Sequence, residues 1–223
     1  MDLHGGARNF ESDRDHTVIG LLHLKPHLEA LSGLDANRAK VNGGNITGDD
    51  IINLSRFENI KVIKGTLSIE STMMLSDLTG LNNITRIEGS LILNNVPLVS
   101  NLDVFNSLEV IEGQLALVGT PNMEQINGLS NLRTLNSIAI VGAASLADLR
   151  GLEGITRLSD GIQIDASSLS SFEGLNNLVS IGRAFSMNGG GNITNFDALS
   201  NLQEVGGAIM LLGFNALTNI DGL

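Results

Sequence analysis

The sequence predicts an all-β repeat protein, a right-handed parallel β-solenoid of about seven to eight rungs with a short helical cap at its N-terminus. Three observations support this fold class. Hydrophobic residues make up 42% of the chain and charged residues 17%, which indicates a folded protein. Apolar residues recur at intervals of 23 or 24 residues from Phe57 to Leu223. Each repeat also contains one short segment with alternating apolar residues, which predicts a strand.

The first 33 residues are predicted to form a lead-in and a cap, and residues 34–223 the solenoid, with regular rungs from residue 57. Pro26 suits the first turn of a helix and Gly33 suits its end. We therefore expect a short amphipathic helix at residues 26–32 that covers the first rung, because an open solenoid end exposes core and strand edge. The apolar residues at helical spacing are Leu21, Leu24, Leu28 and Leu31.

Each regular rung repeats seven apolar positions. The alternating pair predicts a short strand with one face inward, and stacked rungs would align these strands in a parallel sheet. Apolar residues three apart predict tight corners or very short strands around a triangular section. Residues 34–56 are interpreted as a degenerate first rung. In a typical rung the seven positions are Leu81, Ile84, Ile87, Leu91, Leu93, Val99 and Leu102.

Glycines precede the predicted main strand in four rungs, where we expect a left-handed or bulged backbone to turn the chain. In three other rungs the same count falls on Ser137, Asp160 and Arg183. There we expect the corner to shift by one residue. The four glycines are Gly65, Gly89, Gly113 and Gly207.

Composition excludes several classes of function. The net charge of −11 argues against binding to nucleic acid and to anionic membrane surfaces. The chain has no cysteine, which excludes disulfides, a thiolate nucleophile and a Cys-ligated zinc. No apolar run approaches the roughly 20 residues that span a bilayer, so we expect no membrane insertion. The N-terminal residues also lack the pattern of a signal peptide.

The repeat resembles the receptor L domain, the leucine-rich solenoid of the insulin and epidermal growth factor receptor ectodomains. The unit that carries the resemblance is Leu81-x-x-Ile84-x-x-Ile87-x-Gly89-x-Leu91-x-Leu93-Asn94-Asn95, and residues 105–117 repeat it. The unit is also similar to fungal cell-wall proteins and bacterial surface proteins built from such repeats. It borders on ordinary leucine-rich repeats at Leu135-x-x-Ile138-x-Ile140. The resemblance implies a non-enzymatic, extracellular or cell-surface binding domain; without cysteines, growth-factor binding is not implied.

The outward positions of the predicted strands form the candidate ligand-binding surface. Such a flat patch of small apolar residues suits contact with a protein or glycan. The alternative is that a flanking segment or a second copy covers it, as in a structural spacer or a self-associating segment of a larger surface protein. The candidate residues are Ile92, Asn94, Ala116, Val118, Ala139, Val141, Gln163 and Asp165.

Metal binding and catalysis find little support in the sequence. His23 and His27 are four apart, but Pro26 intervenes and no third ligand is evident. No Ser-His-acid set, carboxylate pair or phosphate loop stands at a suggestive spacing. We expect no cofactor, no metal and no enzymatic activity. Weaker candidates are an acidic run at Asp13, Asp15 and His16, a turn at Asp49 and Asp50, and glycosylation sequons at Asn45, Asn53, Asn83 and Asn192.

Overall fold

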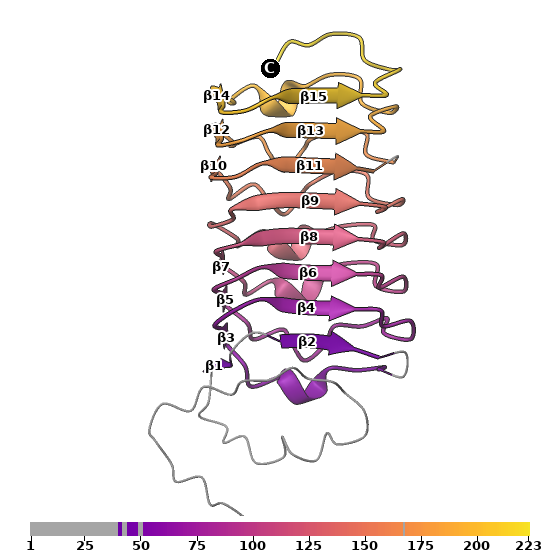
Figure 1. Ribbon diagram of the computed structural model, residues 1–223, viewed down its shortest axis with the longest axis vertical. Helices are drawn as coiled ribbons and strands as arrows, with labels where there is room; N and C mark the ends of the chain where they lie inside the picture. The colour runs from indigo at the N-terminus through magenta and orange to yellow at the C-terminus, as the bar shows by residue number, and fades with distance from the viewer. Residues whose placement is uncertain (1–39, 42–43, 49–50, 167) are drawn as a thin grey trace, which may run out of the picture.

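The computed structural model describes residues 40–41, 44–48, 51–166 and 168–223. In these residues the chain winds into a column of stacked rungs, as predicted (Figure 1). The architecture is a parallel β-solenoid of about seven turns. The predicted helix at residues 26–32 lies outside the described residues, and the right-handed winding stays a prediction.

One wall of the column is the main sheet, which has eight strands. All its strands pair in parallel, in the order β15-β13-β11-β9-β8-β6-β4-β2. Each strand comes from the alternating segment of one rung, so the period-2 pattern predicted this wall correctly. The strands are β2 (Gly44–Thr47), β4 (Leu67–Glu70), β6 (Leu91–Asn94), β8 (Gln114–Val118), β9 (Ser137–Val141), β11 (Ile162–Asp165), β13 (Phe185–Asn188) and β15 (Ile209–Leu212).

The other walls combine very short strands with tight turns, which confirms both forms predicted for the apolar positions three apart. Two-residue strands form a four-stranded and a three-stranded parallel sheet. They are β1 (Lys40–Val41), β3 (Val62–Ile63), β5 (Arg86–Ile87), β7 (Val110–Ile111), β10 (Arg157–Leu158), β12 (Ser180–Ile181) and β14 (Glu204–Val205). Single 3₁₀ turns stand at another corner: η2 (Ser55–Phe57), η3 (Asp103–Phe105), η4 (Asn127–Leu129) and η5 (Asp197–Leu199).

The core runs along the axis of the column. The seven apolar positions predicted for the rung at Leu81 are all buried, with at most 1% of each residue exposed. An eighth inward position, which the sequence pattern did not reveal, follows the main strands from β4 to β15, and in six of these seven rungs its carbonyl accepts the hydrogen bond of a tight turn. Its residues vary from rung to rung, which hides the column in the sequence. They are Thr72, Val96, Thr120, Ala143, Ala166, Gly190 and Phe214, of which Phe214 is partly buried.

Asparagine side chains tie neighbouring rungs together at one corner. Asn83 donates from Nδ2 to the carbonyl oxygen of Glu58 at 2.6 Å, and Asn177 donates to that of Glu153 at 2.8 Å. Asn131 and Asn201 make the same bond to the preceding rung. The bonds occupy carbonyl groups that a tight corner leaves without a backbone partner.

Of the left-handed or bulged backbone predicted for the four corner glycines, the left-handed form is wrong. Gly65, Gly89, Gly113 and Gly207 have no positive φ, and the physical reason for glycine at Gly89 and Gly113 is close approach between rungs. A Cβ atom on Gly89 would lie 2.5 Å from the carbonyl carbon of Gly65. The next residue in this column is Asn136, whose amide donates to the carbonyl of Gly113 at 2.9 Å. The corner therefore shifts by one residue at Ser137, as expected, and Ser137 pairs with Gln114 instead. The shift expected at Asp160 and Arg183 is wrong, because the Asp160 amide donates to the carbonyl of Asn136 and the Arg183 amide to that of Asp160, which keeps both residues in the column.

Candidate functional site

The outward face of the main sheet brings the eight predicted residues together. In the first outward column, Ile92 pairs with Ala116, Ala116 with Ala139, and Ala139 with Gln163. The second outward column has the same register. It runs through Asn94, Val118, Val141 and Asp165.

The centre of this face is a band of aliphatic side chains on β6, β8 and β9, which we call the apolar band. Its exposure is uneven: Ala116 is only 4% exposed, because it is a small residue between Ile92 and Ala139 in its column. The other members are half-buried. The band consists of Ile92, Ala116, Val118, Ala139 and Val141.

Polar residues border the apolar band on both sides. Asn94 lies at one end of it, and Gln163 and Asp165 lie on the next strand, β11; all three are exposed. An apolar centre with a polar rim is the usual anatomy of a protein contact surface. The backbone of the sheet is fixed by its ladder of hydrogen bonds, so a partner would meet a preformed surface.

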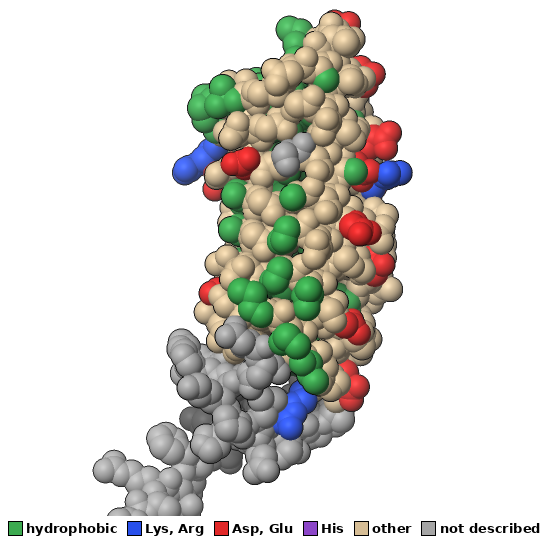
Figure 2. Space-filling view, turned by 90° about the vertical axis from the view of Figure 1, so that its right-hand side faces the viewer, with side chains coloured by type: hydrophobic (Ala, Val, Ile, Leu, Met, Phe, Trp, Pro, Cys, Tyr) green, Lys and Arg blue, Asp and Glu red, His purple; other side chains and the backbone are tan. Residues whose placement is uncertain are grey.

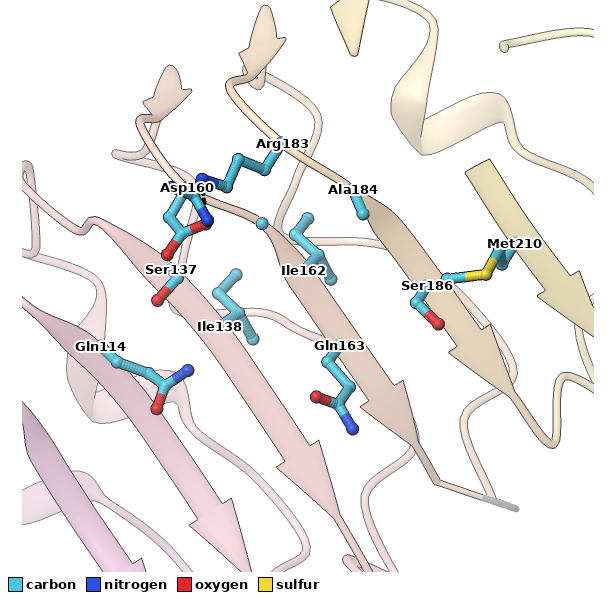
Figure 3. A pocket seen from close by; sticks show the side chains of 11 residues that line it. Gln114, Ser137, Ile138, Asp160, Ile162, Gln163, Arg183, Ala184, Ser186 and Met210 are labelled. Carbon is cyan, nitrogen blue, oxygen red and sulfur yellow. Dashed lines mark ion pairs between the residues drawn. The ribbon is translucent and has the colours of Figure 1, made fainter. Parts of the chain in front are cut away.

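A hollow of about 490 Å³ adjoins the apolar band. It lies over the beginnings of β9, β11 and β13, and its polar side chains come from four rungs (Figure 3). We call it the polar hollow. It is lined by Gln114, Ser137, Ile138, Asp160, Gly161, Ile162, Gln163, Arg183, Ala184, Ser186 and Met210.

The polar hollow exists because small residues form its floor. Gly161 directly follows Asp160 in the chain, and Ala184 directly follows Arg183 at the start of β13 (Figure 3). The floor is tight, since a Cβ atom on Gly161 would lie 2.6 Å from the carbonyl oxygen of Ala184. At the corner, Asp160 and Arg183 continue the column that holds glycine in the first rungs, so their side chains form one edge of the hollow.

The charges in the polar hollow cancel. Arg183 Nε lies 3.4 Å from Asp160 Oδ1, and the two side chains are 78% and 46% exposed. An exposed ion pair of this kind adds little stability, about 0–1 kcal/mol. Its groups therefore stay available to a ligand at little cost. The other polar lining groups are neutral: two carboxamides, on Gln114 and Gln163, and two hydroxyls.

The hydroxyl of Ser137 distinguishes the polar hollow from the same column in other rungs. Thr66 Oγ1 accepts a hydrogen bond from the amide of Ser90 at 3.2 Å, and Ser90 Oγ accepts one from the amide of Gln114 at 3.0 Å. The residue Ser137 is only 6% exposed, yet its hydroxyl has no hydrogen bond within the described part of the chain. Sequence reasoning missed this site; the loss of glycine from the corner column is the signal that points to it.

Other apolar side chains are exposed along the corner that follows the main strands. Figure 2 shows hydrophobic side chains gathered along this corner, with acidic side chains beside them. Met73 is 40%, Met74 57% and Leu98 44% exposed. Sequence reasoning did not identify them. On the sheet face, Met210 (49%) and Leu212 (62%) extend the two outward columns.

The described residues contain no group of three His, Cys, Asp or Glu side chains that could hold a metal ion. The weaker metal candidates, among them His23, His27 and Asp49, lie outside that part of the chain. No helix in the described ranges is long and apolar enough to cross a membrane.

Comparison with known proteins supports the resemblance drawn from the repeat unit. Residues 59–145 match the Receptor L domain family, which generally mediates ligand binding in receptors. Neither the curated proteins nor the solved structures gave a match to the chain. The matched segment includes the strands from β3 to β9, and the same kind of rung continues through β15. Residues 59–145 are therefore similar to the Receptor L domain family, and the structure places this repeat on a parallel β-solenoid.

Proposed function

We propose that the chain is a non-enzymatic binding or adhesion module of the cell surface or extracellular space, and that its outward main-sheet face contacts a protein or glycan. Receptor L domains occur in extracellular regions of receptors and bind protein ligands there, which supports the class of function. The observation that carries the proposal is the apolar band, aligned in register over three neighbouring rungs and bordered by polar residues.

The band suits contact because its side chains are short and sit on a rigid sheet. A partner that covers them removes apolar surface from water, at about 25 cal/mol per Å². Few rotamers are lost on binding, since alanine has no side-chain rotamer and valine has few. The exposed rim residues Asn94, Gln163 and Asp165 then offer hydrogen bonds that set orientation. The net charge of −11 disfavours nucleic acid as the partner.

Two lysines placed in the apolar band test the proposal. We expect Val118→Lys with Val141→Lys to lower affinity at least about tenfold, because a partner would have to desolvate two charges. The measurement is surface-based binding of the purified protein to panels of purified extracellular proteins and immobilised glycans, with saturation as the criterion.

A matched control separates the face from the charge. Asn106→Lys with Ser130→Lys adds the same charge in the same two rungs, at exposed positions that follow η3 and η4. We expect this control to bind like the unaltered protein. Equal affinity for all three proteins would contradict the assignment of the sheet face.

The second candidate function is a structural or self-associating segment of a larger surface protein. It is favoured by exposed apolar side chains along the corner that follows the main strands: Met74 is 57% and Leu98 44% exposed. This candidate predicts a sedimentation coefficient that rises with protein concentration, and loss of that rise in Met74→Glu with Leu98→Glu. A concentration-independent monomer would exclude it.

A further inference from the structure

We propose that the polar hollow is a subsite for a neutral, hydroxyl-rich sugar unit of a glycan. The inference rests on the proposed binding function and names the ligand class for one part of the sheet face. It starts from the side chains that converge on the hollow from different rungs (Figure 3).

The hydrogen-bonding groups of the polar hollow match the hydroxyls of a sugar. Each sugar hydroxyl both donates and accepts, so adjacent hydroxyls need a site that offers both functions. The Asp160 carboxylate only accepts and the Arg183 guanidinium only donates, and their close pairing sets the two functions side by side. Bonds to such charged groups are also the stronger ones. The Gln163 carboxamide adds a donor and an acceptor on the opposite side.

Ser137 is the independent observation that points to a ligand. Its residue is 94% buried and lines the hollow, and its hydroxyl lacks the backbone donor that Thr66 and Ser90 have in the same column. The Ser137 hydroxyl can be reached from the hollow, so a ligand hydroxyl can bond to it without displacing a bond within the protein. Figure 3 shows Ser137 close to Asp160, where one ligand hydroxyl could meet both groups.

The balance of charge favours a neutral ligand. The only charged residues among those lining the hollow are Asp160 and Arg183, which form an ion pair. An anion would be attracted by Arg183 but repelled by the Asp160 carboxylate, and a cation would be attracted by Asp160 but repelled by Arg183. The chain as a whole carries −11, so the local neutrality is a property of this site.

The shape of the hollow favours a sugar over an apolar anchor of a protein. Ile138 and Ile162 below it are at most 2% exposed, so the hollow has no deep apolar pocket for a side chain. Met210, 49% exposed, gives one apolar edge for the C–H groups of a sugar ring. No aromatic residue lines the hollow, so affinity rests mainly on hydrogen bonds, and we expect dissociation constants on the order of 1 mM.

The test uses neutral oligosaccharides of glucose, mannose, galactose and N-acetylglucosamine, with sialylated and uronate-containing oligosaccharides for comparison. Saturation-transfer NMR identifies the sugars that bind, and titration gives their affinities. We expect at least one neutral oligosaccharide to bind. Ser137→Ala and Gln163→Ala should each weaken it about tenfold, and Asp160→Ala with Arg183→Ala should remove detectable binding.

Asp148→Ala with Arg150→Ala is the matched control, because it removes an ion pair outside the hollow. Its affinity should not change. Gln163 is exposed and makes no described side-chain hydrogen bond, so Gln163→Ala keeps the test valid if Ser137→Ala fails to fold.

Three results would overturn the inference. The first is a preference for acidic oligosaccharides, and the second is equal affinity of all variants for the neutral oligosaccharide. The third is that no oligosaccharide binds, while a purified protein does bind and Val118→Lys with Val141→Lys weakens that binding. The last result would leave the proposed function standing. Absence of binding to every protein and oligosaccharide in both panels would overturn the proposed function as well.

Discussion

A Cβ atom on Gly174 would lie 1.9 Å from the carbonyl oxygen of Leu149, one rung earlier in the solenoid. Gly174 also has a φ of +105°, in the region that favours glycine. At the same corner, Arg56, Val104 and Ala198 carry side chains, and all three lie in 3₁₀ turns. The corner therefore has two backbone forms, and a side chain requires the 3₁₀ form.

Gly174→Ala is expected to lower the free energy of unfolding by about 1–3 kcal/mol, because its corner must leave the positive-φ form or keep it under strain. Gly191→Ala is the matched control, since the nearest atom to its Cβ would be 3.7 Å away and its φ is not positive. We expect the control to change stability by less than about 0.5 kcal/mol. Urea denaturation measures both. A neutral Gly174→Ala would contradict the steric account of this corner.

Thr120→Val is expected to stabilise the protein by about 1 kcal/mol. The Thr120 hydroxyl is fully buried and has no hydrogen-bond partner in the described structure, so no hydrogen bond offsets the cost of removing it from water. Valine has the same shape, and Val96 occupies this column one rung earlier without exposure.

The reverse change is the control for Thr120→Val. Val96→Thr should destabilise the protein by about 1–2 kcal/mol, because it buries a new hydroxyl in the same environment. Thermal and denaturant midpoints report both variants. If both variants moved stability in the same direction, packing shape and not the hydroxyl would control this column.

Asp148 is expected to make stability depend on pH in the acid range. Burial raises the pKa of this carboxyl. Hydrogen bonds from the side chain and backbone of Arg150, together with the charge of its guanidinium, lower the pKa by more than burial raises it, so the pKa lies below its ordinary value. The folded state therefore binds fewer protons than the unfolded state in this range. The contribution to stability is present above about pH 4, the ordinary pKa of Asp, and is lost as pH falls through the lowered pKa.

The measurement is the free energy of unfolding between pH 7 and pH 2.5. Relative to Asp148→Asn, the unaltered protein should lose stability over that acid interval, and Arg150→Gln should lose less than the unaltered protein. The same pH slope in all three proteins would show that this pair does not contribute.

Much of the fold follows from the sequence because each rung repeats one inward pattern. Leu91 and Leu93 alternate with Ile92, so the strand, its faces and its place in the stack are fixed by period alone. The eighth core column escaped prediction, since it holds residues as different as Thr120 and Gly190 and no apolar period marks it. Its members are recognised by the turn that they start.

The candidate site could be predicted only in outline. The outward columns followed from the strand pattern, so the residues from Ile92 to Asp165 were placed on one face correctly. The polar hollow depends on a one-residue shift at the corner, which puts Asn136 and not Ser137 in line with Gly113. Sequence counting cannot fix such a shift, because backbone hydrogen bonds between rungs decide it.

The most direct test of binding through the sheet face is the oxidation rate of Met210 in the protein saturated with its ligand. Met210 lies on that face, whereas Met73 and Met74 lie on the corner that follows the main strands, with similar exposure. Met123 and Met187 are fully buried, and their oxidation would report unfolding. Peptide mass spectrometry after timed peroxide treatment gives each rate.

We expect the ligand to slow oxidation of Met210 several-fold and to leave Met73 and Met74 unchanged. Protection of Met73 and Met74 with no change at Met210 would contradict binding through the main-sheet face.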